Sequence, residues 1–87
     1  MSFFQDKIYK RIEITVRKKT AQPEDFAGLL RSLKIRISAI DVRKSMADTT
    51  EKYTYYVYIP AKLDPQKLAA MVEKTEGVVA FSEELFT

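Results

Sequence analysis

Four of the five tyrosines of this 87-residue chain lie in one stretch, YTYYVYI, at positions 53–59. Successive side chains of a β-strand point to opposite faces of the sheet. The pattern therefore predicts two faces, with Tyr53, Tyr55, Val57 and Ile59 on one and Tyr56 and Tyr58 on the other. A tyrosine ring can fill a core, pack against another subunit or stack on a nucleic-acid base. The first question is which of these uses applies to Tyr56 and Tyr58.

A second strand, predicted from Ile8, would add charges beside these rings. Ile12, Ile14 and Val16 alternate with polar residues, among them Arg11 and Glu13. We predict that Arg11, Glu13, Tyr56 and Tyr58 share an open sheet face. Three interpretations remain: an ordinary half-exposed surface, a subunit interface rich in aromatic residues and arginine, or a single-stranded nucleic-acid platform. Glu13 would repel phosphate, and the strand lacks the glycine-containing RNA-recognition string, so nucleic acid is the least favoured.

A basic run, Arg17-Lys18-Lys19, precedes the first predicted helix, where a helix N-terminus could help to bind an anion. Lys18, Lys19 and Thr20 are therefore a weak candidate ligand loop, to which Arg43 and Lys44 could add. Against this, the chain has no glycine before Gly28 to let backbone approach a phosphate closely. A solvated charge run is the alternative.

Catalytic and metal chemistry have little support in the composition. The chain contains no histidine and no cysteine, so the commonest general base and the commonest metal ligands are missing. Its acidic residues do not have the spacing of a calcium loop; those considered are Glu73, Glu76, Glu83 and Glu84. We therefore predict no catalytic residues, no cofactor and no metal site, and a protein that is not an enzyme.

The elements that would position these side chains follow from periodicity. A helix is predicted from Pro23, with apolar residues at helical spacing, and a second from Pro65 with Asp64 as its N-cap. Gly77 is expected to end the second helix in a left-handed conformation. Strands are predicted at 8–17, 34–46, 53–59 and 78–86, with a slip in the second near Ser38–Ala39 and the last at a sheet edge.

The order β-α-β-β-α-β predicts an α+β, ferredoxin-like βαββαβ sandwich: a four-stranded antiparallel sheet with two helices on one face. Right-handed crossovers place the first and third strands in the centre. We expect an N-terminal arm or linker junction at 1–7 and one domain at 8–87. Gly28, on the outer side of the first helix, indicates either tolerated variation or close approach by another helix or subunit.

The segments RIEITV, PEDFAGLLRSLKIRISAIDVRK and LDPQKLAAMVEKTEGVVAF resemble the ACT-domain pattern over residues 8–86. Within that group, the chain is most similar to the C-terminal domain of MgtC/SapB-type bacterial membrane proteins. The resemblance implies a non-catalytic regulatory domain that pairs as a homodimer. It also implies a cytoplasmic location, a membrane-domain parent chain and a parental role in magnesium homeostasis.

Many ACT domains bind an amino acid through a glycine in the loop after the first strand, but here that loop is KKTAQPED. A small-molecule ligand is therefore an open alternative, as is a single-stranded nucleic acid on the open face. We expect regulation and association to be the primary role.

Overall fold

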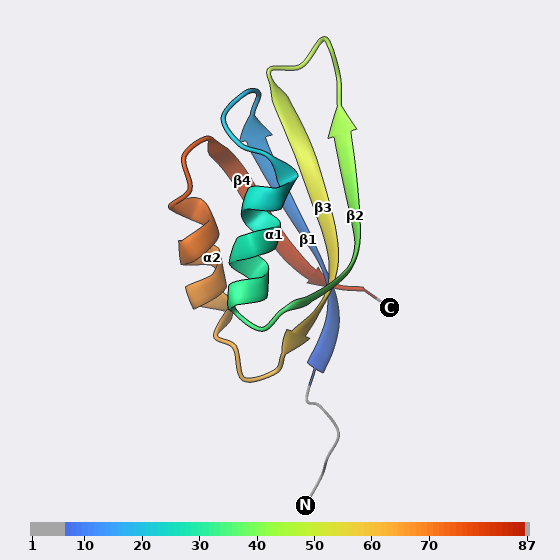
Figure 1. Ribbon diagram of the computed structural model, residues 1–87, viewed down its shortest axis with the longest axis vertical. Coiled ribbons are helices and arrows are strands. Elements are labelled where there is room, and N and C mark those ends of the chain that lie inside the picture. Colours follow the sequence, from blue (N-terminus) through green and yellow to red (C-terminus); the bar gives the residue numbers. More distant parts are fainter. Residues whose placement is uncertain (1–6, 87) are drawn as a thin grey trace, which may run out of the picture.

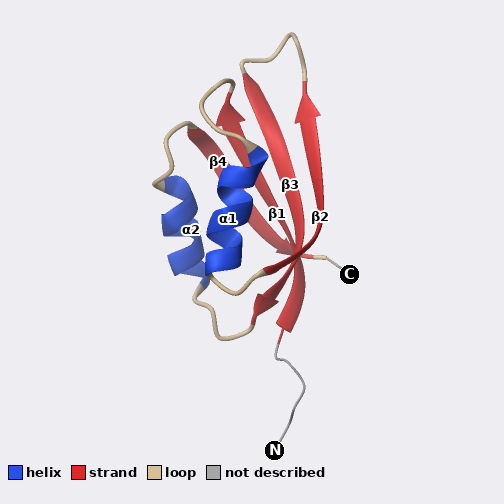
Figure 2. Cartoon of the chain, viewed as in Figure 1, coloured by secondary structure: helices blue, strands red, loops and turns tan. Residues whose placement is uncertain are grey.

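The computed structural model describes residues 7–86 of the chain. Along the chain the elements are β1 (Lys7–Arg17), α1 (Pro23–Ser32), β2 (Arg36–Lys44), β3 (Thr50–Pro60), α2 (Pro65–Glu73) and β4 (Val78–Leu85). The strands form one antiparallel sheet in the order β2-β3-β1-β4, and both helices lie on one side of it (Figures 1 and 2). This confirms the predicted α+β ferredoxin-like fold, with the first and third strands in the centre.

The core lies between the helices and the sheet. The predicted inward residues of β1 and β3 are all buried: Ile12, Ile14, Val16, Tyr55, Val57 and Ile59. Phe26 and Leu30 from α1 and Leu68 and Val72 from α2 close the core from the other side. Burying such side chains contributes about 1.5–3 kcal/mol each, which is the main stabilisation available to a chain of this size.

Both helices begin where the sequence predicts. The Asp64 carboxylate accepts a hydrogen bond from the Gln66 amide at 2.9 Å, and Pro65 follows as the first residue of α2. The Gln22 amide donates to Asp25 Oδ2 at 2.8 Å before Pro23 opens α1. These bonds satisfy amides at the ends that have no partner within the helix.

Each edge strand contains one bulge where it pairs with its central neighbour. In β2 the register shifts between Ile37 and Ala39, so Ser38 is the extra residue, as the predicted slip indicated. In β4 the register shifts opposite Thr15 and Val16, leaving Val79 as the extra residue. The extra residue of each bulge shifts the alternation by one, so side chains three positions apart across it point to the same face. Ile37 and Ile40 therefore share the helix side, as do Val78 and Phe81.

Three predicted boundaries are wrong. The second strand spans Arg36–Lys44 rather than 34–46. The third strand begins at Thr50 rather than at Tyr53, because the hairpin with β2 continues to the pair Lys44↔Glu51. Gly77 does have a positive φ of 92°, but α2 has already ended at Glu73. Gly77 instead forms the turn into β4.

The predicted N-terminal arm, Gly28 and the length of the two helices can each be compared with residues 7–86. Of the predicted arm at 1–7, only Lys7 is among the described residues, and it belongs to β1. Gly28 is exposed, and nothing among residues 7–86 lies within 4 Å of where its Cβ would be. Over the same range, neither helix has the length and apolar character needed to cross a membrane.

Candidate functional site

The sheet face opposite the helices, called here the open face, contains all four residues of the predicted association surface. Arg11 and Glu13 come from β1, and Tyr56 and Tyr58 come from β3. The strands place Arg11 directly opposite Tyr56. All four side chains are half-buried although no helix covers them, because their neighbours on the sheet pack against them.

Four aromatic rings, called here the ring cluster, pack together at one end of the open face. Tyr9 and Tyr58 are stacked with ring centroids 4.7 Å apart and an interplanar angle of 26°. Phe86 lies edge-on to both Tyr9, at 5.3 Å, and Tyr56, at 5.1 Å. Aromatic pairs in these geometries contribute about 0.5–1.5 kcal/mol beyond the area they bury. The rings therefore support each other before any partner binds.

Two arginines flank the ring cluster. The Cζ atom of Arg36 lies 4.9 Å from the Tyr58 ring centroid, and that of Arg11 lies 5.9 Å from the Phe86 centroid. In the sheet register Tyr58 lies between Arg36 on β2 and Tyr9 on β1. Both sides of the Tyr58 ring therefore have a neighbour within the chain.

Arg11 also connects the ring cluster to a group of charges. Its guanidinium donates to the Glu84 carboxylate, which raises the pKa of Arg11 above its ordinary value. Its Nε, buried without a hydrogen-bond partner among residues 7–86, lies 3.7 Å from Glu13 Oε2. Glu13 Oε1 in turn lies 3.7 Å from Lys52 Nζ. Arg11 thus has carboxylates on two sides.

Beyond Arg11 the open face is polar, and a hollow of about 160 Å³ lies there. We call this region the polar trough; its lining residues are Arg11, Glu13, Asp41, Arg43, Lys52, Thr54 and Tyr56. Arg43 Nε lies 3.4 Å from Asp41 Oδ2, so this second pair repeats the alternation of charge. The trough therefore carries both signs of charge, already paired within the chain.

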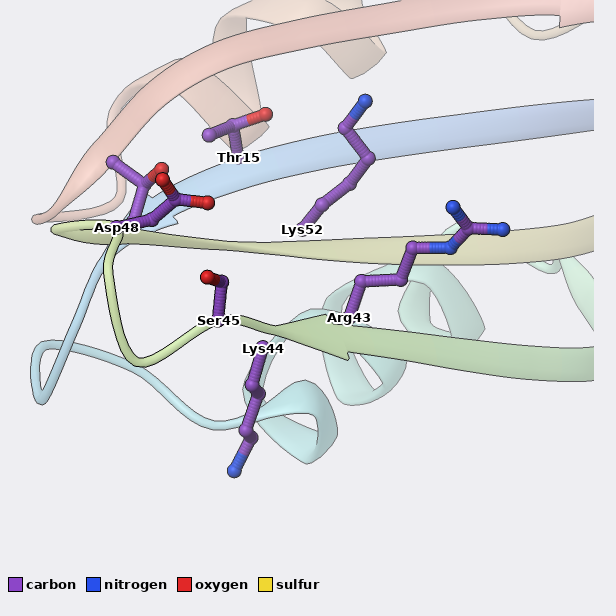
Figure 3. Close-up of a pocket in the computed structure, with 7 residues that line it drawn as sticks. Thr15, Arg43, Lys44, Ser45, Asp48 and Lys52 are labelled. Atoms are coloured by element: carbon purple, nitrogen blue, oxygen red, sulfur yellow. The ribbon is translucent and has the colours of Figure 1, made fainter.

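A larger hollow of about 370 Å³ continues from the trough toward the β2–β3 turn (Figure 3). Arg43 and Lys52 line both hollows, and Ser45, Asp48 and Thr50 complete this one with Thr15 and Lys44. Figure 3 shows the Lys44 side chain extending to the opposite side of β2 from Arg43. The Asp48 carboxylate lines the same hollow as Arg43 and Lys52, which weakens this hollow as an anion site.

The predicted ligand loop, Lys18, Lys19 and Thr20, lies at the same end of the sheet but takes part in the fold. The Thr20 hydroxyl donates to the Arg17 carbonyl at 2.6 Å, and the Lys18 ammonium donates to the Ser45 carbonyl. Thr20 also fills the space next to Gly77 that a Cβ would need. Lys19 is exposed, with a positive φ of 67°.

The two inward tyrosines fix the rest of this loop. The Tyr55 hydroxyl donates to the Pro23 carbonyl at 2.6 Å, and the Tyr53 hydroxyl lies 3.0 Å from the Ala21 carbonyl. Tyr53 also lies 3.0 Å from Glu51 Oε1. Burial is the main cause that raises the pKa of Tyr53 to about 12, and the Glu51 carboxylate is the second. Burial likewise raises the pKa of Tyr55. Both phenols are therefore neutral hydrogen-bond donors that hold the backbone of the loop between β1 and α1.

Sequence reasoning missed three members of the ring cluster and its flank. Tyr9 has the same parity as Arg11, so the signal for it was present in the alternation of β1. Phe86 was hidden by the bulge at Val79, because unbroken alternation from Val78 would assign it to the helix side. For Arg36 the signal was present, since its parity is opposite to that of Ile35 and Ile37 before the predicted slip.

Within residues 7–86 no three acidic side chains come together in a way that could hold a metal ion. The Thr20 and Tyr55 hydroxyls donate to backbone carbonyls, and the buried Tyr53 hydroxyl contacts both the Ala21 carbonyl and the Glu51 carboxylate. The open face thus offers apolar and charged contact surface.

The sequence matches no protein-family model and no curated protein. The structure is similar to the solution structure of the C-terminal domain of the MgtC protein from Mycobacterium tuberculosis, with a TM-score of 0.72 and 15 % sequence identity. The likeness covers 98 % of this chain and 94 % of that one. It confirms, at the level of the fold, the resemblance that the sequence indicated.

Proposed function

We propose that this chain is a non-catalytic regulatory and association domain that pairs with a second copy through its open face. The observation that carries the proposal is the ring cluster, Tyr9, Tyr56, Tyr58 and Phe86, flanked by Arg11 and Arg36. Aromatic residues and arginine are the residue types enriched at protein interfaces. Rings already held by each other lose little conformational entropy when a partner binds.

The charges of the open face suit pairing between identical surfaces. A twofold interface brings the same patch of each copy together, so the patch must be complementary to itself. The polar trough meets this condition because its cations and carboxylates alternate and are already paired, as in Glu13 with Arg11 and Lys52. A second copy would therefore not have to bury an unpaired charge, which is the costly outcome at an interface.

Strand addition at the sheet edges is the competing mode of pairing. The edge strands β2 and β4 each contain a bulge, at Ser38 and Val79. A bulge interrupts the regular row of amides and carbonyls that an added strand would need. The open face is regular, since β1 and β3 pair without a register shift from Lys7↔Pro60 to Arg17↔Thr50. We therefore favour pairing through the face.

The parent protein is inferred from the fold likeness alone. The similarity to the MgtC C-terminal domain supports a corresponding place for this chain, as the cytoplasmic C-terminal domain of an MgtC-type membrane protein. The resemblance would then imply a parental role in magnesium homeostasis, with the domain described here supplying association or regulation.

The test is the solution mass measured by light scattering on a sizing column at micromolar concentration. We expect the wild-type chain to be a dimer and Tyr58→Glu to be a monomer that keeps its circular dichroism and its cooperative unfolding. Met46→Glu is the matched control, because it places the same charge on a fully exposed residue outside the open face. A wild-type monomer, or a Tyr58→Glu variant that remains dimeric, would exclude pairing through this face.

Two other functions remain as alternatives with their own tests. A base stacking on Tyr58 would have to displace Arg36 or Tyr9, so we expect no tight binding of single-stranded RNA at low salt. An amino-acid or small-anion sensor would require Lys18 and Thr20 to give up their backbone hydrogen bonds. We expect no amino acid to raise the melting temperature, as a ligand of the native state would.

A further inference from the structure

A third hollow lies at the end of the sheet where β1 begins and α1 leads into β2, and Arg36 connects it to the ring cluster. It has a volume of about 440 Å³. Four cationic side chains surround two isoleucines there, and we call this surface the basic end: Lys7, Arg31, Lys34, Ile35, Arg36 and Ile37. Ile35 is buried and Ile37 is half-buried. The hollow thus combines a cationic rim with an apolar floor.

The positive charge of the basic end is poorly compensated within residues 7–86. Only Arg31 has an ionic partner there, Glu24 at 3.7 Å, and both side chains of that pair are more than half exposed. Such surface pairs contribute little. Arg31 and Lys34 also face the negative end of the α1 dipole, but Lys7 and Arg36 belong to strands and have no such role. The surface therefore retains a positive field that can attract an anion.

Lys34 is held in a conformation that lysine rarely adopts. Its φ is +65°, and it occupies the position after α1 where glycine is the usual residue. The Ile35 amide donates to the Leu30 carbonyl at 3.1 Å and the Lys34 amide donates to the Arg31 carbonyl at 3.0 Å, which defines a Schellman turn. A strained residue at a charged surface suggests a role that glycine could not fill.

Exposed apolar side chains lie near these cations. Ile8 follows Lys7 and is 36 % exposed, and Leu85, which pairs with Lys10 at the same end of the sheet, is 66 % exposed. Tyr58 lies beside Arg36. Cations mixed with aliphatic and aromatic side chains match the chemistry of a lipid–water interface, where headgroup phosphates lie above hydrocarbon. A nucleic acid would not use the exposed aliphatic residues.

We infer that the basic end docks on an anionic lipid surface. Lys7, Lys34 and Arg36 contact headgroup phosphates, and the neighbouring aliphatic side chains reach the upper hydrocarbon. The contact shares Arg36 with the flank of the ring cluster, whereas Lys7 and Lys34 belong to the basic end alone. The two proposals fail separately in their tests, because the lipid experiment changes Lys7 and Lys34 and the pairing experiment changes Tyr58.

The experiment is sedimentation with vesicles of phosphatidylcholine, with and without phosphatidylglycerol, at low and at high salt. We expect binding only with phosphatidylglycerol and only at low salt. Lys34→Gly should lower the partition coefficient about fivefold, since each cation near such a surface contributes about that factor. The same variant relieves the positive φ, so we expect its Tm to rise by roughly 4–8 °C. A loss of binding with a gain in stability separates function from misfolding.

The matched controls reverse charge at opposite ends of the molecule. Lys7→Glu/Lys34→Glu should abolish binding, whereas Lys44→Glu/Lys74→Glu, on exposed residues at the far end, should preserve it with the same net charge. Equal losses in both variants, or equal binding to phosphatidylcholine alone, would overturn the inference. So would competition by soluble glycerol phosphate or by single-stranded RNA at low concentration, which would assign the basic end to a free phosphate or to nucleic acid.

Discussion

The hydroxyl of Tyr55 donates a hydrogen bond to the carbonyl of Pro23, at 2.6 Å. The bond joins the centre of β3 to the first residue of α1, 32 positions away in the sequence. The Tyr53 hydroxyl likewise contacts the Ala21 carbonyl. In this chain two phenols of β3 therefore hold the loop that leads into α1.

Tyr55→Phe tests this anchoring directly. The substitution keeps the buried ring and removes only the donor, so we expect the free energy of unfolding to fall by about 1–2 kcal/mol. Urea denaturation measures the loss. Tyr58→Phe is the control, because no hydrogen bond from the Tyr58 hydroxyl to the protein is seen among residues 7–86. Equal effects in both variants would mean that the Pro23 bond contributes nothing specific.

Alkaline pH should weaken the fold through the same residues. The pKa of Tyr53 rises from about 10 in the unfolded chain to about 12 in the folded one, because burial disfavours the phenolate. The stabilisation is complete below pH 10 and is lost as pH rises through about 12, since only the unfolded chain has then released its proton. We expect a fall of about 1–2 kcal/mol, measured by denaturation at several pH values. Tyr53→Phe should make this dependence shallower, with Tyr55 supplying the remainder, and an unchanged slope would contradict the assignment.

Lys10 and Glu83 form an ion pair on the helix side of the sheet. The Nζ–Oε2 distance is 2.6 Å, and the side chains are 18 % and 11 % exposed. Removing one partner leaves the other charge half-buried, so Glu83→Gln should cost about 1–3 kcal/mol. Lys10→Met/Glu83→Leu should stay within about 1 kcal/mol of the wild type, because no charge remains unpaired. A double variant less stable than Glu83→Gln would show that the pair is a net source of stability.

A substitution at Gly28 distinguishes pairing through the open face from pairing through the helices. Its position on α1 is exposed with open space around it, so Gly28→Ala should raise the free energy of unfolding by about 1 kcal/mol. If the copies pair through the open face, the dimer should be unaffected in light scattering. A stable but monomeric Gly28→Ala variant would instead place the interface on the helices.

The fold could be predicted because its signals are local and repeated. The alternation in 8–17, the N-cap at Asp64 and the helical spacing from Phe26 each depend on a few neighbouring residues. Strand boundaries could not be predicted where pairing with another strand determines them. Thr50–Lys52 read as a polar turn, and it is pairing with β1 and β2 that makes this segment a strand.

The candidate site could be predicted in its centre but not at its rim. Arg11, Glu13, Tyr56 and Tyr58 lie on unbroken central strands, so parity alone assigned their face correctly. Phe86 lies beyond a bulge, and its contacts and those of Arg36 depend on residues far away in the sequence. The charge of the basic end could not be predicted from the sequence either, because its cations come from β1, α1, the following turn and β2.

The bulges at Ser38 and Val79 also determine which changes of length the chain can survive. Deleting either residue would leave a regular ladder in which every following side chain keeps its face, because Ile37 and Ile40, or Val78 and Phe81, would then lie two positions apart. Deleting one residue elsewhere in either strand would instead rotate the side chains beyond it to the other face. Among relatives of this domain, single-residue deletions within β2 and β4 should therefore be found at the bulges. Other deletions should be found in the β2–β3 turn, where the number of residues does not set the pairing.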